Sequence, residues 1–224
     1  MRLYHHPFSS NCRRVVMAAQ LLGMPLELVE VDLADEGAVR RLGEINPNKM
    51  LPVLQDGDFQ LWESCAIMQY LAELQPEQTL YPQDARARAD VNRWLFWACQ
   101  HFSPAVGVLT WERAWKGMIG EGPANGAEVA RGEREVRKFA GVLEQHLNGC
   151  DWIAGRTISL ADIAIAPTLM YIEVAELPVR GFPNLMAWLE RIKVLEAWKL
   201  TDVESALSQL KISQDCATNT LSVV

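Results

Sequence analysis

The stretch Asn46–Ser64 reads NPNKMLPVLQDGDFQLWES and carries the strongest local signals of the chain. It predicts a turn, a strand that starts at Pro52, a hairpin at Asp56-Gly57, a second strand, and a helix that opens at Ser64. Asp-Gly between two apolar runs favours a tight hairpin turn. Helix N-termini present unpaired backbone N–H groups to anions, so we expect this stretch to hold a small ligand that carries a carboxylate.

The residues before this stretch alternate between strand and helix patterns. Short apolar runs at 2–4 and 26–31 predict strands, and helical periodicity covers 12–22 and 34–44. Because a helix joins the first two strands, we expect them to be parallel, with a right-handed crossover. Residues 1–75 therefore predict a small α/β domain with the order β-α-β-α-β-β-α.

After a proline-containing linker at 76–83, helical patterns replace strands. We expect one long helix over 84–115 with a bend near Pro104 and Gly107, a Gly-rich loop over 116–125, and helices over 127–147, 159–174, 183–192 and 196–210. Ser159 and Asp162 fit a capping box, in which each residue satisfies the other's backbone N–H. The pattern predicts an all-helical domain over 84–212 and a loose tail over 213–224.

Composition excludes several classes of function. The 224 residues carry a net charge of −7 and no Lys/Arg run, which argues against a nucleic-acid partner. No apolar run approaches the ~18 residues of a membrane span, and no signal sequence precedes the first strand, so we expect a cytoplasmic protein without a membrane partner. The five cysteines, Cys12, Cys65, Cys99, Cys150 and Cys216, form no CxxC or zinc pattern, so we expect reduced thiols and no metal.

Taken together, the order of these elements resembles the cytosolic glutathione S-transferases. The matching pieces are Phe8–Arg13, Asn46–Leu54, Leu61–Tyr70, Ile158–Ile163, and Gly181–Leu185 with Trp188-Leu189. The resemblance implies a thioredoxin-like N-terminal domain followed by an all-helical C-terminal domain, and is nearest to the serine-type, theta-like bacterial subclass. It also implies a homodimer that uses glutathione as co-substrate and holds no tightly bound cofactor.

The resemblance implies that Ser9 stabilises the thiolate of glutathione, with Ser10 as a rival. Ser9 matches the activating serine of the family by its distance to Cys12-Arg13. A free thiol has a pKa of about 8.5, and lowering it by about two units stabilises the thiolate by roughly 2.7 kcal/mol. Either serine can also serve only as the cap of the following helix.

The remaining contacts to glutathione are also implied by the resemblance. Ser64 would donate its backbone N–H and hydroxyl to the γ-glutamyl carboxylate at the helix start, and Glu63 would orient that group or meet its ammonium. The backbone of Leu51, before a cis Pro52, would pair with the cysteinyl part as an added strand does.

One position departs from the family pattern. Met50 stands at a glutathione-binding position where the family has Lys or Gln, and its side chain cannot donate to the glycyl carboxylate. Lys49, Arg40 and Arg41 are open as replacements.

A second substrate, a small hydrophobic electrophile, is expected between the two domains against the long helix. Its candidate wall residues are Phe8, Phe102, Trp111 and Trp115. Three functions stay open: transfer of glutathione to the electrophile in detoxification, glutathione-dependent reduction of a peroxide or disulfide, and ligand binding without catalysis.

Overall fold

The computed structural model describes residues 1–204, 206–207 and 209. Its first elements are β1 (Arg2–His5), α1 (Ser10–Leu21), β2 (Glu27–Glu30), α2 (Glu36–Ile45), β3 (Val53–Asp56), β4 (Phe59–Trp62) and α3 (Ser64–Glu73). This is the predicted β-α-β-α-β-β-α order, and the hairpin turn lies at Asp56-Gly57 as expected, with Gly57 at φ 61°. The tail predicted over 213–224 lies outside the described residues.

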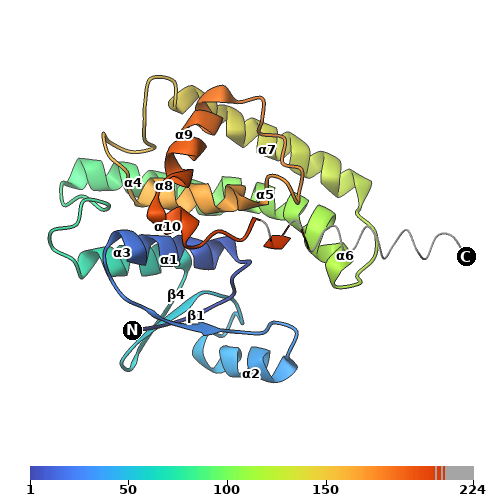
Figure 1. Cartoon of the computed structure of the whole chain (residues 1–224), viewed down its shortest axis with the longest axis horizontal. Helices are drawn as coiled ribbons and strands as arrows, with labels where there is room; N and C mark the ends of the chain where they lie inside the picture. Colours follow the sequence, from blue (N-terminus) through green and yellow to red (C-terminus); the bar gives the residue numbers. More distant parts are fainter. Residues whose placement is uncertain (205, 208, 210–224) are drawn as a thin grey trace, which may run out of the picture.

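The four strands form one mixed sheet in the order β2-β1-β3-β4. β1 and β2 are parallel, as predicted, and the other two pairings are antiparallel. Leu3 pairs with Leu54 and packs into the main core, whereas their neighbours Tyr4 and Val53 belong to a smaller cluster around α2. The alternation of strand side chains thus buries both faces. Figure 1 shows α1 and α3 between the sheet and the helical part, and α2 on the opposite face.

Beyond α3, the described residues contain helices and no strand. The elements are α4 (Ala85–Trp97), a π-helical turn (Ala98–Phe102), α5 (Ser103–Thr110), a second π-helical turn (Trp111–Trp115), α6 (Lys116–Met118), α7 (Gly126–His146), α8 (Leu160–Ile165), a 3₁₀ turn (Ala166–Tyr171), α9 (Pro183–Lys193) and α10 (Glu196–Lys199). The predicted fold class, a thioredoxin-like domain followed by an all-helical one, is confirmed.

The long helix differs from its prediction at its end and in its interior. Helical residues run continuously from Ala85 to Met118, so the loop predicted from Lys116 begins only at 119. The first π-helical turn lies immediately before α5, whose second residue is Pro104. Proline lacks the N–H that the regular helical pattern requires, and a wider turn accommodates that loss. Cys99 of this turn and Ser103, the first residue of α5, lie beside Arg14 of the first domain.

Two predicted helices are shorter than expected. The prediction of a helix over 159–174 is wrong beyond Ile165, because Pro167 interrupts the hydrogen-bond pattern and the chain continues as a 3₁₀ turn. The helix predicted over 196–210 breaks after Lys199, and the Asp202 carboxylate accepts the N–H of Glu204. Part of that predicted range lies outside the described residues.

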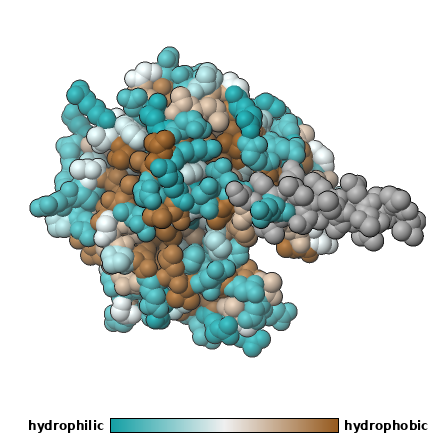
Figure 2. Space-filling model, in the orientation of Figure 1, coloured by the Kyte–Doolittle hydropathy of each residue, from teal (hydrophilic) through white to brown (hydrophobic). Residues whose placement is uncertain are grey.

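Buried polar contacts join the first domain to the helical part. Arg13 of α1 donates to the Trp198 carbonyl (3.2 Å) and the Thr201 hydroxyl (3.1 Å), with its guanidinium 3.8 Å from the centre of the Trp198 ring. The Tyr171 hydroxyl donates to the Phe8 carbonyl. Figure 2 shows hydrophobic residues gathered along the line where the two parts meet. These contacts hold the loop before α1 at a defined place against the helices.

The predicted capping box at the start of α8 is present. Asp162 accepts the Ser159 N–H at 2.9 Å, and the Ser159 hydroxyl accepts the Ala161 N–H at 3.2 Å. The Asp162 carboxylate, which is fully buried, also accepts from the Ile153 N–H and the Trp188 indole N–H. The box therefore ties three segments of the helical domain together.

Candidate active site

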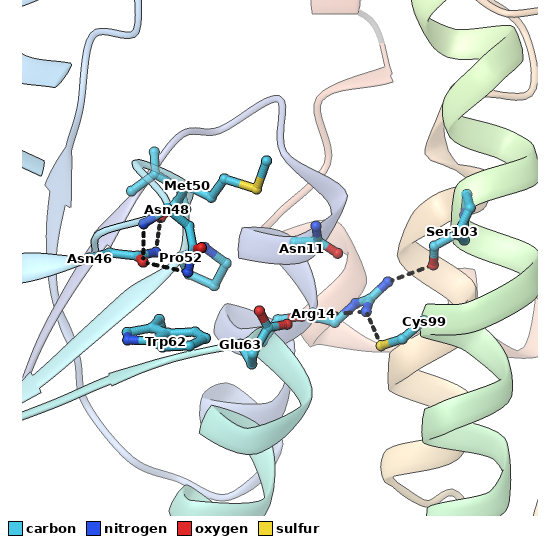
Figure 3. Close-up of a pocket in the computed structure, with 13 residues that line it drawn as sticks. Asn11, Arg14, Asn46, Asn48, Met50, Pro52, Trp62, Glu63, Cys99 and Ser103 are labelled. Atoms are coloured by element: carbon cyan, nitrogen blue, oxygen red, sulfur yellow. Dashed lines mark hydrogen bonds between the residues drawn. The ribbon is translucent and has the colours of Figure 1, made fainter. Parts of the chain in front are cut away.

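A cavity of about 610 Å³ lies where the first domain meets the long helix. Its wall comes from four places: the start of α1, the loop between α2 and β3, the junction of β4 with α3, and the π-helical turn together with the start of α5. The lining residues are Asn11, Arg14, Asn46, Asn48, Met50, Leu51, Pro52, Trp62, Glu63, Ser64, Cys99, Ser103 and Pro104. Figure 3 shows the asparagine-bearing loop on one side and the long helix on the other. The size suits a tripeptide or drug-sized ligand.

The N-terminus of α3 opens into this cavity without a side-chain cap. Glu63 occupies the capping position but makes no capping hydrogen bond, and its φ is 73°. A non-glycine residue rarely adopts this conformation, which costs on the order of 1–3 kcal/mol and is found mostly at functional sites. Ser64 follows at 6% exposure and also lines the cavity. The first N–H groups of α3 are thus available to a carboxylate.

Arg14 places a positive charge behind Ser64. Its guanidinium, on a side chain that is only 1% exposed, donates to the hydroxyls of Ser64 (3.4 Å) and Ser103 (3.1 Å) and lies beside the sulfur atoms of Cys65 and Cys99. Sequence reasoning missed this residue. In the sequence, Arg14 stands out only as a second arginine after Arg13. The helical periodicity does not indicate that either side chain reaches a cavity.

The loop before α1 uses its two serines differently. The Ser9 hydroxyl accepts the Cys12 N–H at 3.3 Å and so caps α1, which leaves its own proton free to be donated. Burial raises the pKa of Tyr171 to about 12, against an opposing effect of Ser10, which lies beside the Tyr171 hydroxyl. Neither serine is among the cavity-lining residues, whereas the exposed Asn11 is. No sequence pattern indicated a role for the Asn11 side chain.

The loop between α2 and β3 is organised by Asn46. Its buried amide donates to the Met50 carbonyl at 2.8 Å and accepts from both the backbone and the side chain of Asn48. The Leu51–Pro52 peptide bond is cis, as the family resemblance implied. Leu51, Pro52 and Met50 all line the cavity.

The cationic candidates for a glycyl carboxylate lie outside the cavity wall. Lys49 has a φ of 54° and is exposed, and its methylene groups lie over Gly43. Arg40 and Arg41 are exposed, and Arg41 pairs with Asp35 at 3.6 Å. Among the described residues of the wall, Arg14 supplies the positive charge. Met50 is 69% exposed and lines the cavity, where its thioether side chain has no hydrogen-bond donor.

The aromatic residues predicted for a second substrate separate into two groups. The Phe8 ring lies 6.1 Å from that of Trp115, which in turn lies 6.3 Å from Tyr171, so these rings gather beside the Ser9 loop. Phe102 is fully buried and stacks on Trp97, and its side chain therefore presents no surface to a ligand in this structure. Trp111 is partly exposed on the long helix.

The cysteines occupy different environments. Cys12 is buried at the start of α1, where burial raises the pKa of its thiol. The sulfur atoms of Cys65 and Cys99 lie 3.4 Å apart, a proximity that their sequence separation does not reveal. Within the described residues, no three His, Cys, Asp or Glu side chains converge on a common point suited to a metal ion. No helix in the described part combines the length and apolarity needed to cross a bilayer.

Comparison with known proteins gives consistent matches along the chain. The sequence model "Glutathione S-transferase, N-terminal domain" matches residues 3–79, and "Glutathione S-transferase, C-terminal domain" matches residues 105–196. "Glutathione S-transferase D7" of Drosophila melanogaster is 30% identical over 217 residues, which are 95% of this chain and 93% of that protein. "Glutathione S-transferase theta-2" of Rattus norvegicus is 32% identical over 206 residues, or 86% and 80% of the two chains.

A solved structure shows the same arrangement of both domains. The delta-class glutathione transferase of Nilaparvata lugens matches with a TM-score of 0.80 and 27% identity, over 95% of this chain and 99% of that one. The likeness covers the cavity and the long helix together.

Proposed function

The chain belongs to the glutathione S-transferase family and is an enzyme of that family, and on this premise we propose that it conjugates the thiolate of glutathione to a small hydrophobic electrophile. The observation that carries the proposal is the uncapped N-terminus of α3, which opens at Glu63 and Ser64 into a cavity of tripeptide size. No resident cofactor is needed for this reaction, because glutathione supplies the reacting sulfur.

The γ-glutamyl end of glutathione carries an ammonium and a carboxylate on one carbon. The N–H groups at the start of α3 and the Ser64 hydroxyl suit the carboxylate, and Arg14 behind Ser64 adds positive charge. The Glu63 carboxylate, which makes no capping bond, suits the ammonium. One end of the cavity therefore places the positive helix start and Arg14 next to the negative Glu63 carboxylate, which matches the two charges of the γ-glutamyl end.

The middle of the tripeptide fits against Leu51. A backbone flanked by Pro52 at the start of β3 can pair with the cysteinyl amide as an added strand does. The glycyl end then lies toward Asn48 and Met50, where the described wall offers an amide in place of a cation. We expect the glycyl carboxylate to contribute less to binding than the γ-glutamyl end.

We expect the glutathione thiolate to bind next to the start of α1. Ser9 is the preferred donor, because its hydroxyl keeps its proton free while it accepts from the Cys12 N–H. Ser10 lies beside the Tyr171 hydroxyl instead. The Asn11 amide, which lines the cavity, is a second donor for the same sulfur. In the reaction the thiol proton leaves to solvent, the thiolate attacks the electrophilic carbon, and a halide or other leaving group departs with its electron pair.

The aromatic rings of Phe8 and Trp115 supply an apolar wall next to that sulfur. This supports a hydrophobic electrophile as the second substrate. The match to delta- and theta-named relatives supports the serine-type, theta-like subclass. We expect the enzyme to act in the cytoplasm.

A homodimer is part of the proposal. Large apolar side chains are exposed on the edge strand β4 and on α4, with Phe59 at the hairpin and Phe96 on the helix. An edge strand with exposed aromatic residues is a surface that proteins commonly cover. Analytical ultracentrifugation should show a dimer, and Phe96→Asp should shift it toward monomer.

The experiment that tests the function combines binding with turnover. Calorimetry should show glutathione binding, and an activated aromatic chloride should be conjugated in proportion to enzyme. Ser64→Ala should weaken glutathione binding by about tenfold, as expected for loss of a hydrogen bond to a charged group. Folded protein, by circular dichroism, that binds no glutathione would sink the proposal and favour a binding protein for another ligand.

A further inference from the structure

Cys65 and Cys99 form a thiol pair at the edge of the cavity. Cys65 is the second residue of α3, Cys99 lies in the π-helical turn after α4, and their sulfur atoms are 3.4 Å apart. Cys99 is exposed and lines the cavity, whereas Cys65 is half-buried behind it. A disulfide needs a sulfur–sulfur distance of about 2.05 Å, so the two are unbonded thiols within a short approach of each other.

Arg14 is a buried cation beside both sulfur atoms. Its Nη1 lies 3.8 Å from the Cys65 sulfur and 3.9 Å from the Cys99 sulfur. Among the described residues, its hydrogen-bond partners are hydroxyls and thiols rather than carboxylates, and its Nε has no hydrogen-bond partner. A buried positive charge without a negative partner is costly, and a thiolate at Cys99 supplies that partner.

The two thiols are not equivalent. The hydrogen bond between the two thiols, together with the Arg14 charge, lowers the pKa of Cys99 to about 6, against the opposing effects of burial and of Glu63. The same hydrogen bond and burial raise the pKa of Cys65. Cys99 is also the sulfur that is exposed and lines the cavity, so it is the expected attacking thiolate, with Cys65 as the thiol next to it. The charged groups that face the pair are Arg14 on α1 and Glu63 before α3.

From this arrangement we propose that Cys99 and Cys65 are a redox-active dithiol that reduces a small hydroperoxide at the wall of the cavity. The Cys99 thiolate attacks one peroxide oxygen, the O–O bond breaks, and the other oxygen leaves as an alcohol or water after taking up a proton. Cys99 becomes a sulfenic acid. The Cys65 sulfur then attacks the Cys99 sulfur, a disulfide forms, and the sulfenic oxygen leaves as water with the Cys65 proton. The thiols lose two electrons, and the hydroperoxide gains them.

The disulfide returns to the dithiol when two equivalents of a small thiol reduce it. Glutathione bound in the same cavity would serve, and that step rests on the proposed function. The oxidation itself needs no glutathione. The two proposals can therefore fail separately.

The direct test uses the full chain, reduced with dithiothreitol, desalted and exposed to one equivalent of hydrogen peroxide at pH 7. Cleavage after Lys and Arg places Cys65 in peptide 50–86 and Cys99 in peptide 94–113, each with a single cysteine. After blocking with an alkylating agent, mass spectrometry without reduction should find these two peptides linked in most chains, and dithiothreitol should release them. Recovery of both peptides unlinked with alkylated cysteines would overturn the proposal.

Variants separate the two roles. Cys65→Ser should stop the reaction at a Cys99 sulfenic acid, which dimedone traps, and Cys99→Ser should leave Cys65 unoxidised. Cys150→Ser removes an exposed thiol after α7 and should not change formation of the linked peptides. If peroxide oxidised Cys65 of the Cys99→Ser variant to a sulfenic acid as fast as it oxidises the wild-type thiols, the assignment of Cys99 as the attacking sulfur would be contradicted.

Alkylation reports the same asymmetry without an oxidant. At pH 6.5 a thiol with a pKa of about 6 is mostly thiolate, whereas an unfolded cysteine with a pKa of about 8.5 is about 1% thiolate. Allowing for the lower nucleophilicity of a less basic sulfur, iodoacetamide should modify Cys99 in the folded chain roughly sixfold faster than in the urea-unfolded chain. Slower modification in the folded chain would contradict the thiolate.

Discussion

The helices α1 and α3 both begin near the cavity, but their N-termini are completed in opposite ways. Ser9 closes α1 by accepting the Cys12 N–H. Glu63 leaves α3 without a side-chain cap and adopts a φ of 73°. A helix N-terminus that has a side-chain cap keeps fewer unpaired N–H groups for a ligand. An N-terminus without a cap keeps N–H groups that a bound anion can satisfy. The difference supports the proposal that the ligand carboxylate binds at the start of α3, and it leaves α1 with a hydroxyl that can donate to sulfur.

The N-terminus of α8 is a third case, in which side chains of the protein satisfy the free N–H groups of the helix. We predict that Asp162→Ala lowers the free energy of unfolding by about 3–5 kcal/mol, because it leaves the buried N–H donors of Ile153, Ser159 and Trp188 without their acceptor. Urea denaturation measures this loss. The fraction that remains folded should bind glutathione with unchanged affinity, and weaker binding by that fraction would place Asp162 in the ligand site instead.

Ser9→Ala tests the closed helix at the cavity. We predict that kcat/KM falls about 30- to 100-fold at pH 6.5, as for loss of one preorganised donor to a developing or resident anion, and that stability falls by about 1 kcal/mol from the lost cap. Because the thiolate loses a donor, the pKa of bound glutathione rises toward about 8.5, so the deficit shrinks as pH increases. The pH profile of kcat/KM measures this shift.

Two variants serve as controls for the Ser9 assignment. Ser10→Ala should change the pH profile little, since Ser10 contacts Tyr171, and Asn11→Ala should shift it by less than Ser9→Ala. If Asn11→Ala lowered kcat/KM as far as predicted for Ser9→Ala, and Ser9→Ala had no effect, Asn11 would be the donor to the thiolate.

Ser64→Ala tests the open helix. The expected result is a roughly tenfold rise in the dissociation constant for glutathione, with kcat nearly unchanged, because the lost contact is made equally in the ground and transition states. Calorimetry and steady-state kinetics measure the two effects separately. An unchanged dissociation constant would mean that the carboxylate binds elsewhere.

Tyr171→Phe should give the smallest effect. It removes the hydrogen bond to the Phe8 carbonyl but leaves the ring beside Trp115. We predict about a threefold loss of kcat at saturating glutathione, from a less firmly held Ser9 loop. A loss as large as that of Ser9→Ala would indicate a direct role for the phenol.

Local chemistry was sufficient to predict much of the fold. Asp56-Gly57 determined the hairpin, and the Ser159–Asp162 spacing identified a box that the structure contains. Pro104 and Pro167 were harder to interpret. The first is accommodated inside a continuous helix by a π-helical turn, and the second converts the helix into a 3₁₀ turn. Sequence alone does not show which outcome tertiary packing will stabilise.

The cavity wall could be predicted from the sequence where one continuous segment supplies it, but not where two distant segments meet. Leu51, Pro52, Glu63 and Ser64 belong to one continuous stretch, and all line the cavity. Arg14, Cys99 and Ser103 come together only because α1 packs against the long helix. Phe102 looked similar to Phe8 in the sequence, but the turn of the helix buries it.

A crystal structure with bound glutathione would show directly which helix start holds the ligand carboxylate. We expect the γ-glutamyl carboxylate about 2.7–3.2 Å from the Ser64 N–H, with the ammonium near Glu63 and the sulfur within hydrogen-bond reach of Ser9 or Asn11. A carboxylate bound at the start of α1, with the N-terminus of α3 facing water, would contradict this expectation.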